Sequence, residues 1–404
     1  MVGQEEISVV INTQKQSFLG KEVGLLRSAL PHIPIIPSYV TIISGLRRCG
    51  KSTLLLQLLR DRYQDALYLN FEDIRLVNFE TADFTRLYQE LRTRRVTVVF
   101  LDEVQLIDKW EIFVHQLLRE DYQVFVTVSN ASLLSKELGT HLTGRHVSME
   151  LFPFSYREFV EFTTGDYGEH SLRECLQYGG IPEYVKVRNS LIVNTLMADV
   201  LVKDIAVRHS VRDVESLKQL AVYLVANVGS PVSANKLTGL FGVRSTATLL
   251  EFFSYFRDAY LIEFLPQFSY SLKAQSRNPK KVYAIDTGLI TAVSTAFTEN
   301  NGRRLENLIY LHLRRQFSEL YYFNEEGECD FVVFQQNKAI HAVQVCYQID
   351  DVNFDREYRG LLAAMKAFNL QHGTIVTFNQ ADRFEEDGRV IELVPAFVYL
   401  QHSK

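Results

Sequence analysis

Short apolar runs recur along residues 1–154 and alternate with longer amphipathic segments. The run at 96–101 is almost continuously apolar, which is typical of a strand buried on both faces of a parallel sheet. The pattern therefore predicts an α/β domain over residues 1–154, with a helical segment leading into its first strand. The five predicted strands lie near residues 41–43, 66–71, 96–101, 123–128 and 147–151.

The pattern changes after residue 154 and predicts three further domains. Residues 155–212 are mostly helical and are interrupted at Gly179, Gly180 and Pro182. Residues 213–298 contain three short helical patterns followed by two strands, and residues 299–404 are of the α/β type. We therefore expect a four-domain chain of the α/β class.

A glycine-rich turn separates the first strand from the following helix. It has the spacing G-x-x-x-x-G-K-S from Gly45 to Ser52, which is that of a phosphate-binding P-loop. Lys51 would contact the β- and γ-phosphates of ATP, and Ser52 would bind Mg²⁺. The alternative is a glycine turn without a ligand. The predicted nucleotide-binding residues are Gly45, Arg48, Cys49, Gly50, Lys51, Ser52 and Thr53.

Two acids end the third apolar run, as in a Walker B motif. Asp102 would hold Mg²⁺, mostly through water, and Glu103 would orient and deprotonate the attacking water. The alternative is a strand that ends in two solvated acids. P-loop ATPases with a catalytic Glu insert the fourth strand between the first and third, so we expect the sheet order 5-1-4-3-2.

Three further residues are candidates for contacts with the γ-phosphate. Asn130, at the end of the fourth strand, would bind the γ-phosphate or the attacking water, with Ser129 as substitute; alternatively, Asn130 caps a helix. Arg145 would act as an arginine finger on a neighbouring subunit, or pair with a carboxylate on its own surface. With residues 155–212 as a lid, Arg208 is a second sensor candidate or a surface charge.

The composition narrows the class of protein. A formal net charge of −5 argues against a uniformly basic nucleic-acid surface but allows a local basic patch. The four cysteines show no C-x-x-C spacing, which is typical of reduced thiols in the cytoplasm. Neither a signal peptide nor an apolar run of membrane-spanning length is visible, so we expect a cytoplasmic protein without a membrane segment.

Residues 213–298 have the layout of a winged helix, with three helices and a hairpin. Arg244, Ser245 and Thr248 would lie near the start of the third helix, where a recognition helix meets a groove in DNA. The hairpin would contact phosphates. Alternatively, the domain binds a protein. The basic residues of the hairpin are Lys273, Arg277, Lys280 and Lys281.

Residues 299–404 resemble the restriction-endonuclease fold, in which a helical Glu, a strand Asp and a Glu-x-Lys bind Mg²⁺ and activate water. Glu306 and Asp330 match the first two positions. Gln344 and Cys346 stand where Glu and Lys would be; Gln is a weak Mg²⁺ ligand and Cys cannot supply the cation. We therefore expect this domain to bind DNA or another subunit without cleaving DNA.

Several motifs together resemble a widespread prokaryotic family of AAA+-type ATPases of the extended branch, whose C-terminal domain has no known function. The resemblance covers nearly the whole chain and implies ATP hydrolysis. The segments that carry it are 45–53, 68–73, 101–105, 129–134, 151–155, 178–182, 278–283, 286–288 and 306–307.

These features favour an ATP-hydrolysing, DNA-binding protein that uses Mg²⁺ and forms a homo-oligomer, with a ring expected. It would act as a motor on DNA, including branched DNA, in recombination or repair. One alternative is a nucleotide-regulated signalling or defence switch that recruits a protein partner. Another is an ATP-dependent nuclease, which Gln344 and Cys346 disfavour.

Overall fold

The computed structural model describes residues 1–131, 144–293 and 300–401 and forms two compact units. The first comprises Met1–Phe152 and Asp258–Tyr260, and the second comprises Pro153–Arg257 and Leu261–Lys404. The expected division of the chain into four domains, with boundaries after residues 154, 212 and 298, stays a prediction.

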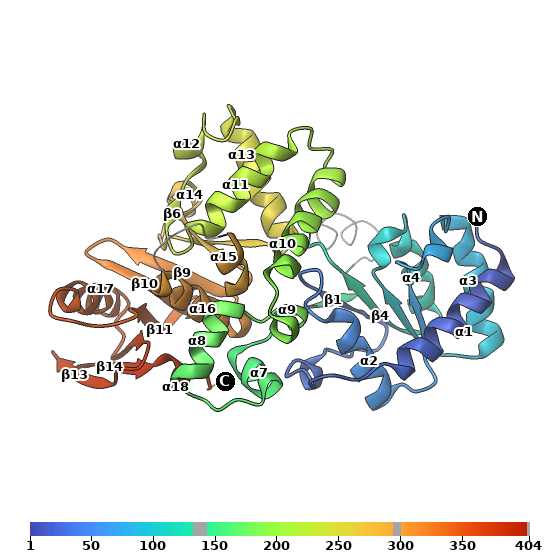
Figure 1. Cartoon of the computed structure of the whole chain (residues 1–404), viewed down its shortest axis with the longest axis horizontal. Helices are drawn as coiled ribbons and strands as arrows, with labels where there is room; N and C mark the ends of the chain where they lie inside the picture. The colour runs from blue at the N-terminus through green and yellow to red at the C-terminus, as the bar shows by residue number, and fades with distance from the viewer. Residues whose placement is uncertain (132–143, 294–299, 402–404) are drawn as a thin grey trace. The chain divides into compact units, whose positions relative to one another are not determined.

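The first unit is built on a parallel sheet with the order β2-β3-β4-β1-β5 (Figure 1). This is the predicted order 5-1-4-3-2 read from the other edge, so the predicted fold class is confirmed. The central strand β1 is buried along its whole length because β4 and β5 flank it. The strands are β1 (Val40–Ser44), β2 (Leu67–Asn70), β3 (Val98–Asp102), β4 (Gln123–Val128) and β5 (His146–Glu150).

Helices cover this sheet and close its core. The N-terminal helix α1 contacts β2 and α3, and its Ile7, Val10 and Ile11 side chains are buried in the core that these elements share. The α-helices are α1 (Gln4–Gly20), α2 (Lys51–Arg62), α3 (Phe84–Arg94) and α4 (Trp110–Arg119). The short 3-10 helices are η1 (Leu30–His32), η2 (Ile74–Leu76), η3 (Thr81–Asp83) and η4 (Val104–Leu106).

The second unit begins with a helical segment whose ends follow local capping chemistry. Ser155 and Glu158 form a capping box at the start of α7, and Pro182 stands at the first position of α9. The break expected around Gly179 and Pro182 is therefore observed. The helices are α7 (Tyr156–Thr163), α8 (Glu169–Tyr178), α9 (Pro182–Val187), α10 (Ser190–Asp199) and the π-helix η5 (Val200–Val207).

The next part combines helices with a three-stranded antiparallel sheet of order β6-β8-β7. These elements suit the predicted winged helix, which stays a prediction. The expected hairpin contains a short helix, α14, because the Ser271 side chain accepts a hydrogen bond from the Ala274 N–H and caps it. The elements are α11 (Val214–Ala226), β6 (Pro231–Val232), α12 (Ala234–Leu237), α13 (Thr246–Asp258), β7 (Ile262–Pro266), α14 (Leu272–Arg277), β8 (Lys280–Ala284) and α15 (Thr287–Val293).

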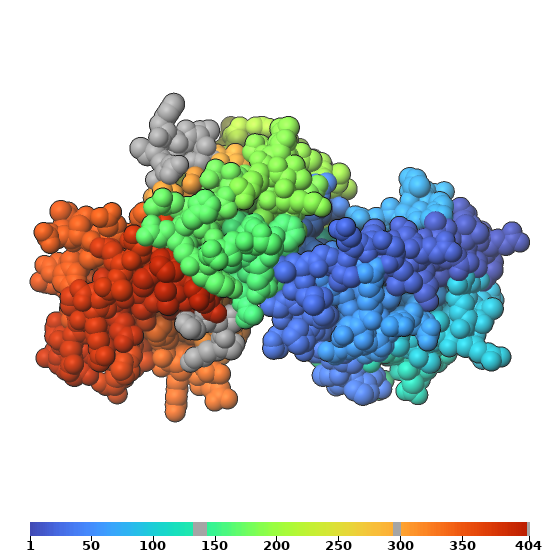
Figure 2. All heavy atoms as spheres, turned by 60° about the horizontal axis from the view of Figure 1, so that its bottom comes forward, coloured from blue at the N-terminus to red at the C-terminus, as the bar shows by residue number. Residues whose placement is uncertain are grey.

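The C-terminal part is a six-stranded mixed sheet of order β13-β14-β12-β11-β10-β9, against which α17 packs. In Figure 2 the red C-terminal part touches the green helical segment. Asn379 of the C-terminal part donates a hydrogen bond to Glu169 of the helical segment at 2.9 Å. The elements are α16 (Asn301–Gln316), β9 (Glu319–Asn324), β10 (Glu328–Gln335), β11 (Lys338–Val345), α17 (Phe354–Ala367), β12 (His372–Thr377), β13 (Asp382–Glu386), β14 (Arg389–Pro395) and α18 (Ala396–Tyr399). Within the described residues, no helix is long and apolar enough to span a bilayer.

Candidate nucleotide-binding site

The P-loop connects β1 to α2 through backbone conformations that need glycine. A Cβ atom at Gly45, where φ is 148°, would lie 2.3 Å from the carbonyl oxygen of Leu151. Gly50, at the N-cap of α2, has φ 101° and no side chain with which to bind the first N–H groups of the helix. The start of α2 is therefore suited to an anion such as a phosphate.

Lys51 is buried at the start of α2, with 3% of its side chain exposed. Its Nζ atom donates to the carbonyl oxygens of Gly45 and Leu46, each at 3.2 Å, and lies 3.4 Å from Oε1 of Glu103. Burial acts to lower the pKa of Lys51, but the nearby Glu103, Cys49 and Asp102 together outweigh it and raise the pKa. The ammonium group is therefore charged and lies at the P-loop.

Asp102 ends β3 and is fully buried. Its Oδ2 accepts hydrogen bonds from the Tyr68 hydroxyl at 2.7 Å and from Nδ2 of Asn70 at 3.1 Å, and its Oδ1 accepts one from Thr127. Burial and Glu103 raise the pKa of this carboxyl, and the Ser52 hydroxyl lies near enough to Asp102 to act against this rise. The two predicted Mg²⁺ ligands thus lie next to each other, and their oxygen atoms fit that metal ion.

Glu103 is held toward the P-loop by its backbone and by its neighbours. Its φ of 54° is unusual for a non-glycine residue, and its N–H donates to Oγ1 of Thr127 at 2.8 Å. Gln105 donates one hydrogen bond to the Glu103 carboxylate and another, at 3.0 Å, to Oγ of Ser129. Burial acts to raise the pKa of Glu103, but Lys51, Gln105 and Arg47 together outweigh it, so the pKa is lowered and the carboxylate is ionised.

The structure adds residues that sequence reasoning did not assign to the site. Gln105 joins Glu103 to the end of β4, where the predicted sensors Ser129 and Asn130 are both buried. Gln105 follows the Walker B acids by two residues, but no sequence pattern indicated its hydrogen bonds.

Two arginines near the P-loop were also missed. Arg27 is 4% exposed and donates to the carbonyl oxygens of Cys49 and Phe152, both at 2.8 Å. Arg47 forms an ion pair with Glu72 at 3.1 Å. The pKa of Glu72 is raised, mainly by burial and next by the charge of Glu103.

The remaining predicted nucleotide-binding residues lie on the same loop and helix. Cys49 is buried, and its Sγ atom lies 3.3 Å from the carbonyl oxygen of Leu151. Arg48 is exposed, and Thr53 is half-buried on the first turn of α2. Their contacts with a nucleotide stay predictions.

Arg145 lies at the N-terminal end of the parallel strands, whereas the P-loop of the same chain lies at their C-terminal end. It precedes β5, which pairs in parallel with β1, so that Val40 is opposite His146 and Ser44 is opposite Glu150. The P-loop follows Ser44, about 13 Å away along the strands at about 3.3 Å per residue. Arg145 is exposed. Arg145 is therefore far from its own P-loop, and both the arginine-finger role on another subunit and the pairing with a carboxylate on its own surface stay predictions. Arg208 belongs to the second unit and stays a prediction.

The predicted DNA-binding residues divide into exposed and buried groups. Arg244 and Ser245 are exposed but precede α13, which begins at Thr246, so they are not on the third helix as expected. Thr248 is half-buried on α13. On α14, Lys273 and Arg277 are exposed.

Lys280 and Lys281, on β8, are less accessible. Lys280 is half-buried, and burial, followed by the charge of Arg257, lowers its pKa. Lys281 is 1% exposed and contacts three carboxylates. The prediction that Lys281 contacts DNA phosphates is therefore wrong.

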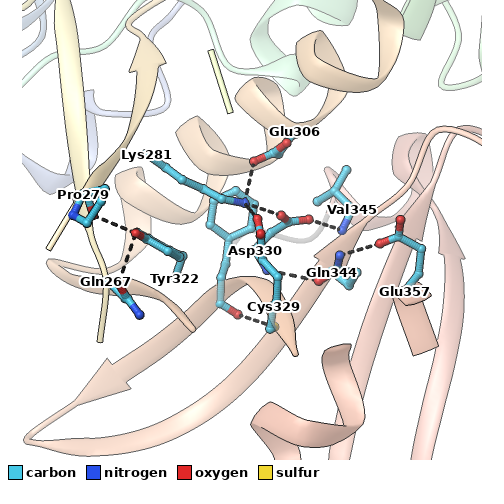
Figure 3. Close-up of polar contacts among 12 residues, drawn as sticks. Gln267, Pro279, Lys281, Glu306, Tyr322, Cys329, Asp330, Gln344, Val345 and Glu357 are labelled. Carbon is cyan, nitrogen blue, oxygen red and sulfur yellow. Dashed lines mark hydrogen bonds and ion pairs between the residues drawn. The ribbon is translucent and has the colours of Figure 1, made fainter. Parts of the chain in front are cut away.

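The endonuclease-like acids converge on this buried lysine (Figure 3). Lys281 Nζ lies 2.6 Å from Asp330 Oδ1 and 3.4 Å from Glu306 Oε1. Burial acts to lower the pKa of Lys281, but the acids outweigh it and raise the pKa well above its ordinary value. The sequence argument that Cys346 leaves these acids without a cation needs correction, because a lysine from another part of the chain supplies it.

Two family profiles match the chain. One, described as an AAA domain, matches residues 37–160, and the other, described as a domain of unknown function, matches residues 169–300. An uncharacterized protein of Methanocaldococcus jannaschii is 32% identical over 396 residues, covering 90% of this chain and 88% of that protein. An uncharacterized protein of Haemophilus influenzae is 30% identical over 336 residues, covering 78% and 84% of the two chains.

Among solved structures, AMPPCP-bound DnaA from Aquifex aeolicus matches with a TM-score of 0.29 and 16% identity, covering 56% of this chain and 83% of that chain. The Aeropyrum pernix ORC1 protein in complex with DNA matches with a TM-score of 0.26 and 12% identity, covering 69% and 92%. At these scores the structural likeness carries no argument. The family is instead shown by the 32% identity to the Methanocaldococcus jannaschii protein, which extends over 90% of this chain. The chain belongs, with its archaeal and bacterial relatives, to a family of P-loop proteins that carry an AAA domain.

Proposed function

We propose that this protein hydrolyses ATP to ADP and phosphate at the P-loop between β1 and α2. The observation that carries the proposal is the pairing of a buried lysine at the start of α2 with a buried, ionised carboxylate at the end of β3, namely Lys51 and Glu103. A P-loop that only holds a phosphate would not need this second group. A carboxylate near the phosphates is the group that can take a proton from water.

The residues around Lys51 and Glu103 would have separate roles in nucleotide binding and hydrolysis. The N–H groups at the start of α2 and the Lys51 ammonium would bind the phosphates. Ser52 and Asp102 would hold Mg²⁺, which, when bound, neutralises charge on the phosphate oxygens. Gln105 would keep Glu103 oriented while Lys51 turns to the nucleotide, because its hydrogen bond to the carboxylate does not involve Lys51.

We further propose that the second unit binds DNA and that ATP hydrolysis is coupled to this binding. Exposed Lys273 and Arg277 on α14 and Arg244 before α13 supply positive charge for phosphate contacts. Oligomerisation is supported by the position of Arg145, which suits action on a neighbour's nucleotide. The proposal of a DNA-coupled ATPase includes ring formation and a role in recombination or repair.

A second candidate function is a nucleotide-regulated switch that recruits a protein. The observation that favours it is the exposure of Tyr270 and Leu272, at 86% and 79%, beside the basic residues of α14. Exposed aromatic and aliphatic side chains are more typical of a protein contact than of a phosphate contact.

Phosphate release measured with and without DNA distinguishes the two functions. Turnover stimulated by DNA, with stimulation that falls steeply as salt rises, supports the DNA-coupled ATPase because phosphate contacts release counterions. Turnover that is unaffected by duplex, single-stranded, forked and four-way DNA supports the switch. The absence of turnover under all these conditions would contradict the ATPase proposal itself.

A further inference from the structure

Lys281 places a charged ammonium group inside a cage of carboxylates. The lysine belongs to β8, whereas the acids belong to other elements: Glu306 to α16, and Glu328 and Asp330 to β10. Its Nζ atom lies 2.6 Å from Asp330, 2.7 Å from Glu328 and 3.4 Å from Glu306. One nitrogen atom thus takes oxygen contacts from three directions, as a bound cation does.

Other groups hold two of the carboxylates in place. Asp330 Oδ2 accepts a hydrogen bond from the Val345 N–H at 2.9 Å, and Glu306 Oε1 accepts one from the Tyr283 hydroxyl at 2.8 Å. These bonds leave Asp330 Oδ1 directed at the lysine (Figure 3). Asp330 and Glu306 are therefore oriented by partners other than Lys281, and we expect them to keep much of their arrangement without it.

The cage borders a cavity through which an ion could enter. Its volume is about 280 Å³, and the side chain of Glu328, at its rim, is 47% exposed. The cavity also contains Arg356, which is exposed and pairs with Glu357, away from the lysine cage. Its lining residues are Gly229, Lys281, Glu306, Glu328, Asp330, Gln344, Val345, Arg356 and Glu357.

We propose that Lys281 is an internal cation that fills a metal-type site formed by Glu306, Glu328 and Asp330. As long as the lysine is present, the site does not take a divalent ion, and its removal opens a site for one. Carboxylate oxygens are the ligands that Mg²⁺, Mn²⁺ and Ca²⁺ prefer, at about 2.0–2.6 Å. The lysine contacts of Asp330 and Glu328, at 2.6 and 2.7 Å, are close to these lengths, whereas Glu306, at 3.4 Å, would have to move closer to bind a metal ion.

This assignment gives a physical reason why the endonuclease-like domain would not cleave DNA. The cation expected beside a phosphate is instead buried among the acids, where only 1% of Lys281 is exposed. With the lysine in place, Glu306, Glu328 and Asp330 are not arranged to hold a metal ion, and no other group of three His, Cys, Asp or Glu side chains in the described part of the chain is so arranged. The lysine also ties β8 to β10, beside a second link in which the Tyr322 hydroxyl donates to the Pro279 carbonyl at 2.7 Å.

The test is a titration of nucleotide-free, full-length protein with Mn²⁺, with free Mn²⁺ followed by electron paramagnetic resonance. We expect Lys281→Ala to bind one more Mn²⁺ per chain than the wild type, and the double variant Lys281→Ala/Asp330→Asn to lose it. Lys280→Ala, the adjacent control, should match the wild type. Mn²⁺ should also raise the thermal midpoint of Lys281→Ala more than that of the wild type, because it binds the folded state.

Two results would overturn the proposal: Mn²⁺ binding by the wild type that Asp330→Asn removes, and folded Lys281→Ala that gains no Mn²⁺. Should Lys281→Ala fold only when Mn²⁺ is supplied, that rescue supports the proposal. Should Lys281→Ala not fold at all, Glu328→Gln is the deciding variant, because the Glu328 side chain is 47% exposed at the rim and we expect its replacement to leave the protein folded. We expect Mn²⁺ to leave the midpoints of the wild type and Glu328→Gln equally unaffected; a rise in the wild type alone would overturn the proposal.

Discussion

The Nζ atom of Lys51 lies 3.4 Å from Oε1 of Glu103, although the two residues come from different strand ends of the first unit. Lys51 is the first residue of α2, which follows β1, and Glu103 follows β3. In the sheet, β4 lies between β1 and β3. The pair therefore connects the phosphate-binding turn to the proposed catalytic acid across the inserted strand. We expect this ion pair to keep Glu103 ionised until a nucleotide competes for the lysine.

Gln105→Ala should slow ATP hydrolysis with little change in ATP binding. The variant removes the hydrogen bonds that orient Glu103 and join it to Ser129. Loss of one hydrogen bond to a charged group, about 1.5 kcal/mol, corresponds to about a tenfold fall in kcat. Steady-state kinetics check this. Gln105→Glu is unsuitable as a control because it adds a charge, so the exposed Gln335→Ala serves instead. An altered KM with unchanged kcat would contradict the positioning role.

Arg145→Ala should leave ATP binding intact and reduce turnover. Arg145 lies at the opposite end of the strands from the P-loop of its own chain. If it contacts a nucleotide, we therefore expect this to be the nucleotide of another subunit. Mixing Arg145→Ala with Glu103→Gln subunits should restore part of the activity at interfaces that join an intact arginine to an intact glutamate. Mixed samples no more active than the two separate variants would count against action between subunits.

Replacing Lys273 and Arg277 together by Ala should weaken DNA binding for all sequences. Both side chains are exposed on α14. If each contacts one phosphate, the slope of log K against log salt should flatten by about 0.9 for each residue. Binding titrations at several salt concentrations measure this, with exposed Lys338 and Arg383 replaced as the matched control. Equal affinities in the two double variants would remove α14 from the DNA surface.

Asp286 should make the second unit less stable as the pH rises toward 7 and above. Burial raises the pKa of this carboxyl to about 7, although the N–H groups of Gly180 and Gly288 donate to it. Because the folded pKa exceeds the ordinary value, the group contributes stability that is fully present below about pH 4 and is lost as the pH passes through 7. Denaturant unfolding at pH 5 and pH 8 checks this.

The comparison for this test is Asp286→Asn, which cannot ionise. Its stability relative to the wild type should rise between pH 5 and pH 8, because the wild type alone loses the contribution. A constant difference between the two proteins across that range would show that Asp286 does not titrate there.

The first unit was predictable because its signals are local. Continuous apolar runs define strands that are buried on both faces, and the turn from Gly45 to Ser52 combines spacing and glycine conformations that few other structures need. The P-loop and Walker B acids are each adjacent to the strand that positions them. The sheet order was expected because P-loop ATPases with a catalytic Glu insert the fourth strand between the first and third.

The missed features depend on contacts that are distant in the sequence. Lys281 was assigned to a surface hairpin because its basic neighbours suggested one, yet its carboxylate partners lie 25 to 49 residues further along. Arg27 reaches the P-loop carbonyl of Cys49 from the segment before β1. Such pairings arise from the packing of whole elements, and no periodicity in the sequence reports them.

The most direct test of the account is ATP hydrolysis by Glu103→Gln, measured together with ATP binding. Glutamine keeps the size of the side chain but cannot take a proton from water, so we expect wild-type binding and a fall in hydrolysis of about a hundredfold or more. Lys51→Ala should instead lose binding as well, and exposed Glu385→Gln should match the wild type. Glu103→Gln that binds ATP and hydrolyses it at the wild-type rate would contradict the proposed catalytic pair.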